Sequence, residues 1–250
     1  MIYFLRYTAF VILLFTSLIA TTPVCVFRFG NPKNNSVFFR IFNFLKKYLG
    51  GIDVHTQGVE IIKNVHPSVI IGNHQHNFDV LTVSDLFQGR TIVLGKDELK
   101  HIPIFGQIYV ACGNLLVKRG NRKEAMKSMN ELAQKINNRS LSVLVFPEGH
   151  RNRKKEMLPF KKGAYHTAIR TQAPIICFSA AQYVQHVNFN TFRKVKMFVK
   201  VHEPISTKGL TNDDIPLLIE KTRKVIADGI EELNQKYYLK EQKETSITQA

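Results

Sequence analysis

Short apolar runs in this 250-residue chain stop abruptly at glycine, proline or a polar cluster. Residues 68–71 run into Gly72 and Asn73, and residues 141–146 stop at Pro147. Runs bounded in this way are typical of strands that are buried on both faces of a sheet. Longer stretches with helical spacing lie between them. This alternation predicts an α/β domain with a mixed, largely parallel sheet flanked by helices.

The same reasoning assigns an element to most of the chain after residue 51. Strands are predicted at residues 68–71, 91–94, 115–117, 141–146, 174–181 and 195–201, the last as an edge strand because its apolar and polar residues alternate. Helices are predicted at residues 80–87, 104–111, 121–137, 162–171 and 212–237. Ligands of open α/β sheets bind at the carboxyl ends of the strands, so we expect the functional site on the loops that follow them.

The N-terminal segment is of a different kind. Residues 8–27 contain no charged residue, and about 20 such residues is the length of a bilayer-spanning helix. A retained anchor is favoured over a cleaved signal peptide because the apolar stretch resumes at Val24, while Pro23 also allows a hairpin within one leaflet. Basic residues are sparse before this segment and frequent after it, which predicts that the rest of the chain faces the cytosol.

Residues 37–49 place apolar side chains at helical spacing, with Arg40, Lys46 and Lys47 between them. Such a helix fits a membrane surface, with basic residues toward anionic headgroups. A helix packed on the core of the following domain fits the same spacing. We therefore expect an anchor and amphipathic helix at residues 1–50, a catalytic domain at residues 51–240 and a flexible tail at residues 241–250.

The formal net charge of +16 implies an anionic partner, which is nucleic acid, an anionic membrane surface or a phosphorylated substrate. A nucleic-acid-binding protein does not normally begin with an apolar anchor, so we expect membrane lipids and no nucleic acid. Cys25, Cys112 and Cys177 are not spaced as a disulfide framework or a zinc site, which favours a reducing environment.

A polar cluster that contains His74 and Asp79 follows residues 68–71. Histidine is suited to take a proton from an alcohol, most of all when a carboxylate holds its other ring nitrogen. Five positions along a regular helix is ~500° of rotation, so the two meet only if His74 lies in the turn and Asp79 in the first helical turn. Two alternatives stay open: a metal site that uses His74 and His76, and a structural His74 satisfied within the core.

A second cluster, with Glu148, Gly149 and Arg151, follows residues 141–146. A glycine that lets the backbone approach a ligand and an arginine beside it can form a phosphate clamp. The basic residues that follow, Arg153, Lys154 and Lys155, fit a solvated loop.

These clusters carry a resemblance to a known family. Residues 73–75 with Asp79 resemble the H-x4-D motif of the glycerolipid acyltransferases, and residues 146–149 with Arg151 resemble their F-P-E-G-T-R motif. Residues 113–119 are similar to a third block, G-x-x-F-I-D-R, and residues 173–176 to a fourth, V-P-I-V. Residues 157–164 also resemble the stretch after the second motif in 1-acylglycerol-3-phosphate acyltransferases of eukaryotic type.

The resemblance implies that His74 is the general base on the free sn-2 hydroxyl of lysophosphatidic acid and that Asp79 orients it. The oxygen would attack the thioester of acyl-CoA directly and give phosphatidic acid, which fits a sequence without a G-x-S-x-G elbow or a cysteine beside a histidine. The implied substrate-binding residues are Lys96, Gly113, Arg119, Glu148, Gly149 and Arg151. The resemblance implies no metal or cofactor, and a location on the cytosolic side of the endoplasmic reticulum membrane.

Three positions depart from the family pattern. His76 stands where a serine is usual, His150 replaces threonine, and residues 116–118 replace F-I-D. Lys118 reverses a charge beside Arg119, which fits stronger attraction for phosphate or a different acceptor headgroup. Two other hypotheses remain: the same chemistry on another lysophospholipid or on glycerol 3-phosphate, and a basic membrane-binding module without enzymatic activity.

Overall fold

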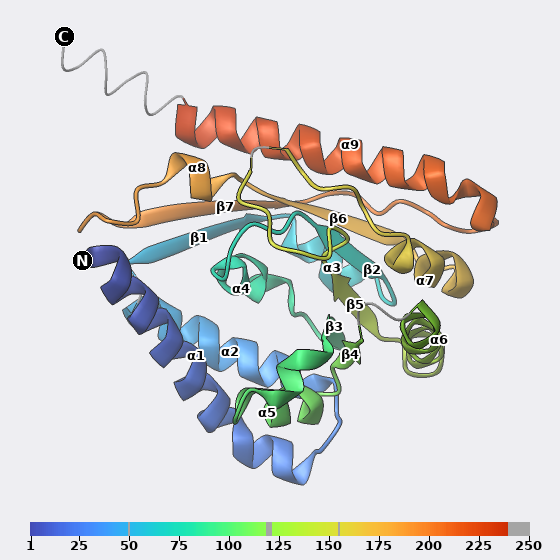
Figure 1. Cartoon of the computed structure of the whole chain (residues 1–250), viewed down its shortest axis with the longest axis horizontal. Coiled ribbons are helices and arrows are strands. Elements are labelled where there is room, and N and C mark those ends of the chain that lie inside the picture. The colour runs from blue at the N-terminus through green and yellow to red at the C-terminus, as the bar shows by residue number, and fades with distance from the viewer. Residues whose placement is uncertain (50, 119–121, 155, 240–250) are drawn as a thin grey trace.

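The structure, a computed structural model, describes residues 1–49, 51–118, 122–154 and 156–239. Within these residues a seven-stranded sheet runs through the molecule in the order β1-β7-β6-β2-β5-β3-β4 (Figure 1). Its strands are β1 (Ile52–Gln57), β2 (Val69–Gly72), β3 (Thr91–Lys96), β4 (Leu115–Val117), β5 (Ser142–Val145), β6 (Ile175–Ala180) and β7 (Val195–Val201). Neighbouring strands are parallel except β6 and β7. The predicted α/β class and mixed, largely parallel sheet are confirmed.

Helices cover both faces of the sheet (Figure 1). One face packs against α1 (Ile2–Phe27), α2 (Lys33–Leu49), α4 (Asp79–Val83) and α5 (Phe105–Ala111). The other packs against α6 (Arg122–Arg139), α7 (Gly163–Thr171) and α9 (Ile215–Asn234). The remaining elements of the described residues are short helices α3 (Val59–Asn64) and α8 (Tyr183–His186), 3-10 turns at Ser84–Leu86, Asp97–His101 and Asn212–Asp214, and a π turn at Gln235–Leu239.

The central strands explain the continuous apolar runs. In β2, Ile70 packs into the core beneath α1 and α2, whereas Val69 and Ile71 pack into the core beneath α6, α7 and α9. All three side chains are fully buried. Because successive side chains point to opposite faces of a sheet, a strand covered on both faces needs apolar residues at every position.

The prediction of an edge strand at residues 195–201 is wrong. β7 lies between two neighbours, parallel to β1 and antiparallel to β6. Sequence reasoning missed β1 because exposed Asp53, His55 and Gln57 leave that segment without an apolar run. The alternation of β7 therefore reflects partial burial within the sheet.

The two N-terminal helices share a core with the sheet. Pro23 lies inside α1 without ending it, and α2 turns back along α1 (Figure 1). Phe10, Leu13 and Phe42 belong to the same buried cluster as Ile70. Among the described helices, α1 is long and apolar enough to cross a membrane, and 33% of its most apolar window is buried in the protein.

The outer side of α1 stays apolar as well. Its exposed large side chains include Phe4, Leu5, Ile12, Ile19 and Phe27. An exposed apolar face of this length indicates membrane association. The helix thus presents one apolar side to the protein core and another to its surroundings.

Candidate active site

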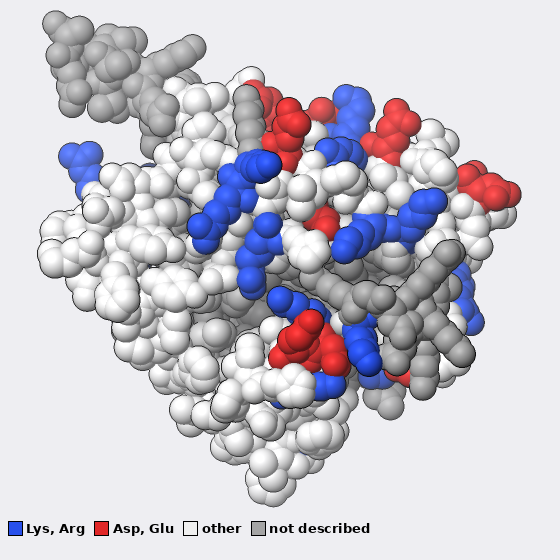
Figure 2. All heavy atoms as spheres, in the orientation of Figure 1, with Lys and Arg blue, Asp and Glu red and all other residues white. Residues whose placement is uncertain are grey.

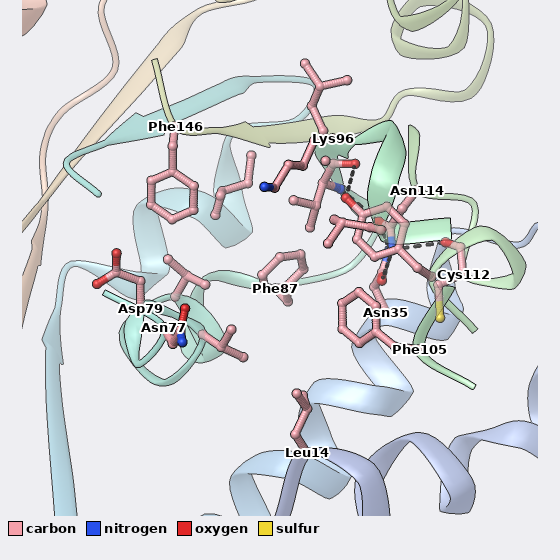
Figure 3. A pocket seen from close by; sticks show the side chains of 18 of the residues that line it. Leu14, Asn35, Asn77, Asp79, Phe87, Lys96, Phe105, Cys112, Asn114 and Phe146 are labelled. Carbon is pink, nitrogen blue, oxygen red and sulfur yellow. Dashed lines mark hydrogen bonds between the residues drawn. The ribbon is translucent and has the colours of Figure 1, made fainter. Parts of the chain in front are cut away.

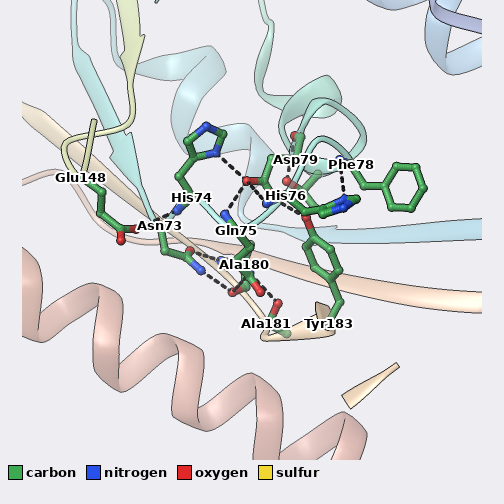
Figure 4. Close-up of polar contacts among 11 residues, drawn as sticks. Asn73, His74, Gln75, His76, Phe78, Asp79, Glu148, Ala180, Ala181 and Tyr183 are labelled. Carbon is green, nitrogen blue, oxygen red and sulfur yellow. Dashed lines mark hydrogen bonds and ion pairs between the residues drawn. The ribbon is translucent and has the colours of Figure 1, made fainter. Parts of the chain in front are cut away.

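His74 and Asp79 meet at the carboxyl end of β2. His74 lies in the loop after the strand, and Asp79 is the first residue of α4. His74 Nδ1 donates a hydrogen bond to Asp79 Oδ2 over 2.6 Å (Figure 4). This is the turn-plus-helix arrangement expected from the sequence. Since Nδ1 is engaged and His74 lines a cavity, Nε2 is the ring nitrogen left for a substrate.

The Asp79 carboxylate is held from several directions. Oδ2 also accepts hydrogen bonds from the backbone amides of Gln75, over 2.6 Å, and His76, over 3.1 Å. Oδ1 accepts a hydrogen bond from the hydroxyl of Tyr183. Asp79 is only 2% exposed, and these donors hold its carboxylate in one orientation.

The His74 ring is also held by an aromatic stack. The ring of Phe146, at the end of β5, lies 3.9 Å from the imidazole centroid with 15° between the planes. Because β2 and β5 are parallel neighbours, their end residues come side by side. Sequence reasoning did not assign Phe146 a role. Its position at the end of the neighbouring buried strand is the signal that could have indicated one.

Glu148 braces the backbone of the His74 loop. Its Oε1 accepts from the His74 amide over 2.9 Å, and its Oε2 accepts from the Leu158 amide over 2.8 Å. The backbone amide of Asn152 donates to the backbone carbonyl of His74 over 2.8 Å. Burial raises the pKa of Glu148, and the amides of His74 and Leu158 oppose that shift. The loop after β5 thus fixes the loop after β2.

The end of β6 holds the same loop from the other side. The side chain of Asn73 donates to the Ala180 carbonyl and accepts from its amide, over 2.9 and 2.8 Å. Gln75 donates to the Ala181 carbonyl over 2.9 Å. Three strand ends therefore fix the segment that carries His74.

The remaining loop residues contact α1. Asn77 donates to the Tyr7 hydroxyl over 2.8 Å, and His76 Nε2 lies 3.4 Å from the Tyr3 hydroxyl. The buried ring of Phe78 packs edge-on against Phe10, with centroids 5.2 Å apart. Burial lowers the pKa of His76, and nearby Arg153 and Arg151 add to this against the opposing charge of Asp79.

A cavity of about 410 Å³ opens beside His74. The polar and charged residues that line it include His74, Asp79, Asn77, Lys96, His150 and Arg151, and Asn35 and Asn114 line it as well. Its apolar walls come from α1, α2, α4, β3 and α5, and include Leu14, Leu18, Phe38, Phe39, Phe87, Phe105 and Ile108 (Figure 3). The volume is within the range of small-molecule sites, and the walls suit an alkyl chain that ends at a polar group.

The predicted site residues divide into two groups. Lys96, Gly149 and Arg151 line the cavity with His74 and Asp79. Glu148 lies behind the wall, with both carboxylate oxygens bound to backbone amides.

Gly113 also lies off the cavity wall. It has φ +74° and packs against the turn between α1 and α2, where an added Cβ would lie 2.8 Å from the Gly30 carbonyl oxygen. Its position therefore supports backbone packing rather than substrate contact. Arg119 lies outside the described residues.

Positive charge gathers over the centre of the face in Figure 2, where Lys and Arg side chains surround a hollow. Lys96 and Arg151 add cations to the cavity itself. A histidine paired with a carboxylate, nearby cations and an apolar interior fit a site that takes a proton from the hydroxyl of an amphipathic, anionic molecule.

Comparisons with known proteins identify the same class. The family model described as Acyltransferase matches residues 53–180. The 1-acyl-sn-glycerol-3-phosphate acyltransferase of Haemophilus influenzae is 35% identical, over 89% of this chain and 95% of that protein. The human 1-acyl-sn-glycerol-3-phosphate acyltransferase alpha is 33% identical, over 84% of this chain and 74% of that protein.

The crystal structure of the 1-acyl-sn-glycerophosphate acyltransferase from Thermotoga maritima has the same fold. It matches with a TM-score of 0.67 at 21% identity, over 92% of this chain and 97% of that one. The chain belongs to the acyltransferase family, together with the 1-acyl-sn-glycerol-3-phosphate acyltransferases of bacteria and eukaryotes. The resemblance indicated by its motifs is thereby confirmed.

Proposed function

We propose that this enzyme transfers an acyl chain from acyl-CoA to the sn-2 hydroxyl of lysophosphatidic acid and forms phosphatidic acid. The observation that carries the proposal is the His74–Asp79 pair, joined over 2.6 Å, in the wall of a cavity whose lining also contains many apolar side chains. The names of relatives at 33–35% identity support the acceptor.

In the proposed reaction, His74 Nε2 takes the proton of the acceptor hydroxyl while the oxygen attacks the thioester carbonyl carbon. Asp79 stabilises the imidazolium that forms, as in other carboxylate–histidine pairs. The tetrahedral intermediate then collapses, the carbon–sulfur bond breaks and the coenzyme A sulfur leaves with the proton that His74 returns. No acyl-enzyme is formed, and no metal or cofactor takes part.

Lys96 and Arg151 would bind the acceptor phosphate. Both line the same cavity as His74, and charge-assisted hydrogen bonds to phosphate are among the stronger polar contacts. Gly149, at φ +74°, lets the backbone approach the same headgroup. Arg119 completes this set by its place in the motif.

The membrane placement follows from the N-terminal helices. Residues 1–50 would attach the enzyme and form part of the cavity wall, and residues 51–240 would carry the chemistry. We place the enzyme on the endoplasmic reticulum with the catalytic domain in the cytosol, supported by the basic residues that follow α1. Protease treatment of intact microsomes would digest the catalytic domain, whereas protection of that domain would contradict this orientation.

Purified enzyme supplied with labelled acyl-CoA and a panel of acceptors tests the proposed function. We expect lysophosphatidic acid to react at least about tenfold faster than lysophosphatidylcholine or monoacylglycerol, because one charged hydrogen bond is worth that factor. Equal rates would contradict the roles of Lys96 and Arg151. A preference for glycerol 3-phosphate or for another lysophospholipid would replace the proposed acceptor while keeping the reaction type.

A further inference from the structure

The proposed mechanism leaves one contact of Asp79 without a role. Oδ2 faces His74 Nδ1, but Oδ1 accepts a hydrogen bond from the hydroxyl of Tyr183 (Figure 4). Tyr183 is the first residue of α8, 104 positions further along the chain, and is fully buried. No motif of the sequence pointed to it.

Tyr183 is a permanent donor in this contact. Burial and the charge of Asp79 raise its pKa well above the usual range, so the hydroxyl is protonated at neutral pH and donates to Asp79. A donor on Oδ1, opposite the three donors on Oδ2, fixes the rotation of the carboxylate. It also draws negative charge away from the oxygen that faces His74.

The fold holds Tyr183 firmly in place. The amide of the preceding residue, Gln182, donates to the side chain of Asn234 on α9 over 2.9 Å, and Asn234 donates back to the Gln182 side chain over 2.9 Å. The ring of Tyr183 packs edge-on against Phe189, with centroids 6.1 Å apart. The hydroxyl is therefore directed at Asp79 by both the end of β6 and α9.

We propose that Tyr183 is a positioning residue for acyl transfer, which acts on His74 through Asp79. The inference rests on the proposed function, because it assigns His74 the role of base. Tyr183 sets the orientation of the carboxylate and limits how strongly Asp79 stabilises the imidazolium. Other charged or titratable groups near this chain of contacts include Arg151, Arg153 and Glu148 from the loop after β5, His76 from the His74 loop, and Tyr238 beside Tyr183. Lys96 and His150 line the same cavity as His74, and Tyr3 of α1 contacts His76.

The test is Tyr183→Phe, with Tyr165→Phe as its matched control. Tyr165 is also fully buried, and its hydroxyl makes one hydrogen bond, to Thr222 over 2.8 Å, in the core on the other face of the sheet. Steady-state rates with labelled acyl-CoA are measured from acid to alkaline pH, and thermal unfolding is recorded for both variants.

We expect Tyr183→Phe to lower kcat about 5- to 50-fold, with little change in either KM, because a hydrogen bond to a charged group is lost within the catalytic unit. The ascending limb of kcat/KM should move to higher pH by roughly a few tenths of a unit, since Asp79 then holds the imidazolium more strongly. Tyr165→Phe should lower thermal stability without changing kcat or the pH profile.

A Tyr183→Phe enzyme with the kcat and pH profile of the wild type overturns the proposal, as does an equal loss of kcat in both variants. If Tyr183→Phe does not fold, 3-fluorotyrosine inserted at position 183 replaces it. This stronger donor should move the limb to lower pH, and an unmoved limb overturns the proposal. If the wild-type enzyme is inactive on lysophosphatidic acid, the proposed function is overturned instead. The ratio of wild-type kcat to Tyr183→Phe kcat is then measured with the acceptor that the wild type uses.

Discussion

Two buried carboxylates, Asp79 and Glu148, flank the same histidine and serve it differently. Both are 2% exposed; Asp79 begins α4 after the loop that follows β2, and Glu148 lies on the loop that follows β5. Asp79 binds the His74 ring nitrogen and the Tyr183 hydroxyl, whereas Glu148 accepts hydrogen bonds from the backbone amides of His74 and Leu158 and also interacts with the side chain of Asn152. Asp79 therefore touches the group that changes charge in the proposed reaction, and Glu148 holds the loop that carries that group.

This difference separates two kinds of motif residue. An acid that contacts a titrating ring affects the transition state, while an acid that satisfies backbone amides affects the stability of the loop. Sequence patterns place both acids directly after buried strands and do not distinguish them. The direction in which each carboxylate points does distinguish them.

The largest expected effect comes from His74→Ala, which removes the group that both carboxylates serve. We expect kcat to fall by about 10³-fold or more, because the general base is lost. The backbone amides that bind Asp79 and Glu148 remain, so the melting temperature should stay near that of the wild type. Acyl-transfer assays and thermal unfolding measure both. His166→Ala, a histidine on α7 bonded to Asn212, should leave kcat unchanged.

A smaller effect is expected from substituting Lys96 or Arg151, cations that line the cavity. Arg151→Ala or Lys96→Ala should raise KM for lysophosphatidic acid about 10- to 100-fold, because each removes a charged hydrogen bond to phosphate. Neither variant should raise KM for an uncharged acceptor by a comparable factor. Lys154→Ala, an exposed lysine on the same loop, is the control. An equal rise in KM for both kinds of acceptor would refute a phosphate role.

Phe146→Leu tests whether the ring of His74 needs a second support besides Asp79. The variant keeps an apolar side chain but removes the stack at 3.9 Å. We expect kcat to fall about 3- to 10-fold, since an aromatic pair contributes roughly 0.5–1.5 kcal/mol beyond its burial. Phe198→Leu, on β7, removes a stack with Tyr237 at the same centroid distance of 3.9 Å and controls for the loss of a buried ring. Wild-type kcat in Phe146→Leu would mean that Asp79 alone positions the imidazole.

The smallest effect should come from Tyr7→Phe, which removes the hydrogen bond from Asn77. This bond joins α1 to the loop that carries His74, which other contacts also hold, so we expect a loss of about two- to fivefold in kcat and normal membrane attachment. Tyr237→Phe is a matched control, because the Tyr237 hydroxyl accepts an amide hydrogen bond of the same 2.8 Å length from Gln57. Equal behaviour of the two variants would show that α1 does not support the catalytic loop.

The sequence predicted the parts of the molecule that local pattern determines. The apolar runs at β2 and β5 gave the buried strands, and the turn-plus-helix argument placed His74 against Asp79. It could not give contacts that depend on the packing of distant segments. Tyr183 reaches Asp79 from 104 residues away, and β1 was missed because half of its side chains are polar and exposed.

The orientation of Glu148 was beyond the sequence for the same reason. An F-P-E-G segment after a strand is equally compatible with a carboxylate that faces the substrate and one that faces the neighbouring loop. The amide of Leu158, ten residues further on, completes its binding. Only the folded loop brings that amide close to the end of β5.

The most direct test compares kcat for Asp79→Asn and Glu148→Gln at a temperature at which both variants are folded. Each change replaces one buried carboxylate by an amide, so both should lose stability, by about 1–3 kcal/mol. We predict that Asp79→Asn loses about 10²- to 10⁴-fold in kcat, whereas Glu148→Gln loses less than about tenfold. Wild-type kcat in Asp79→Asn, or equal losses in the two variants, would contradict the division of roles between these carboxylates.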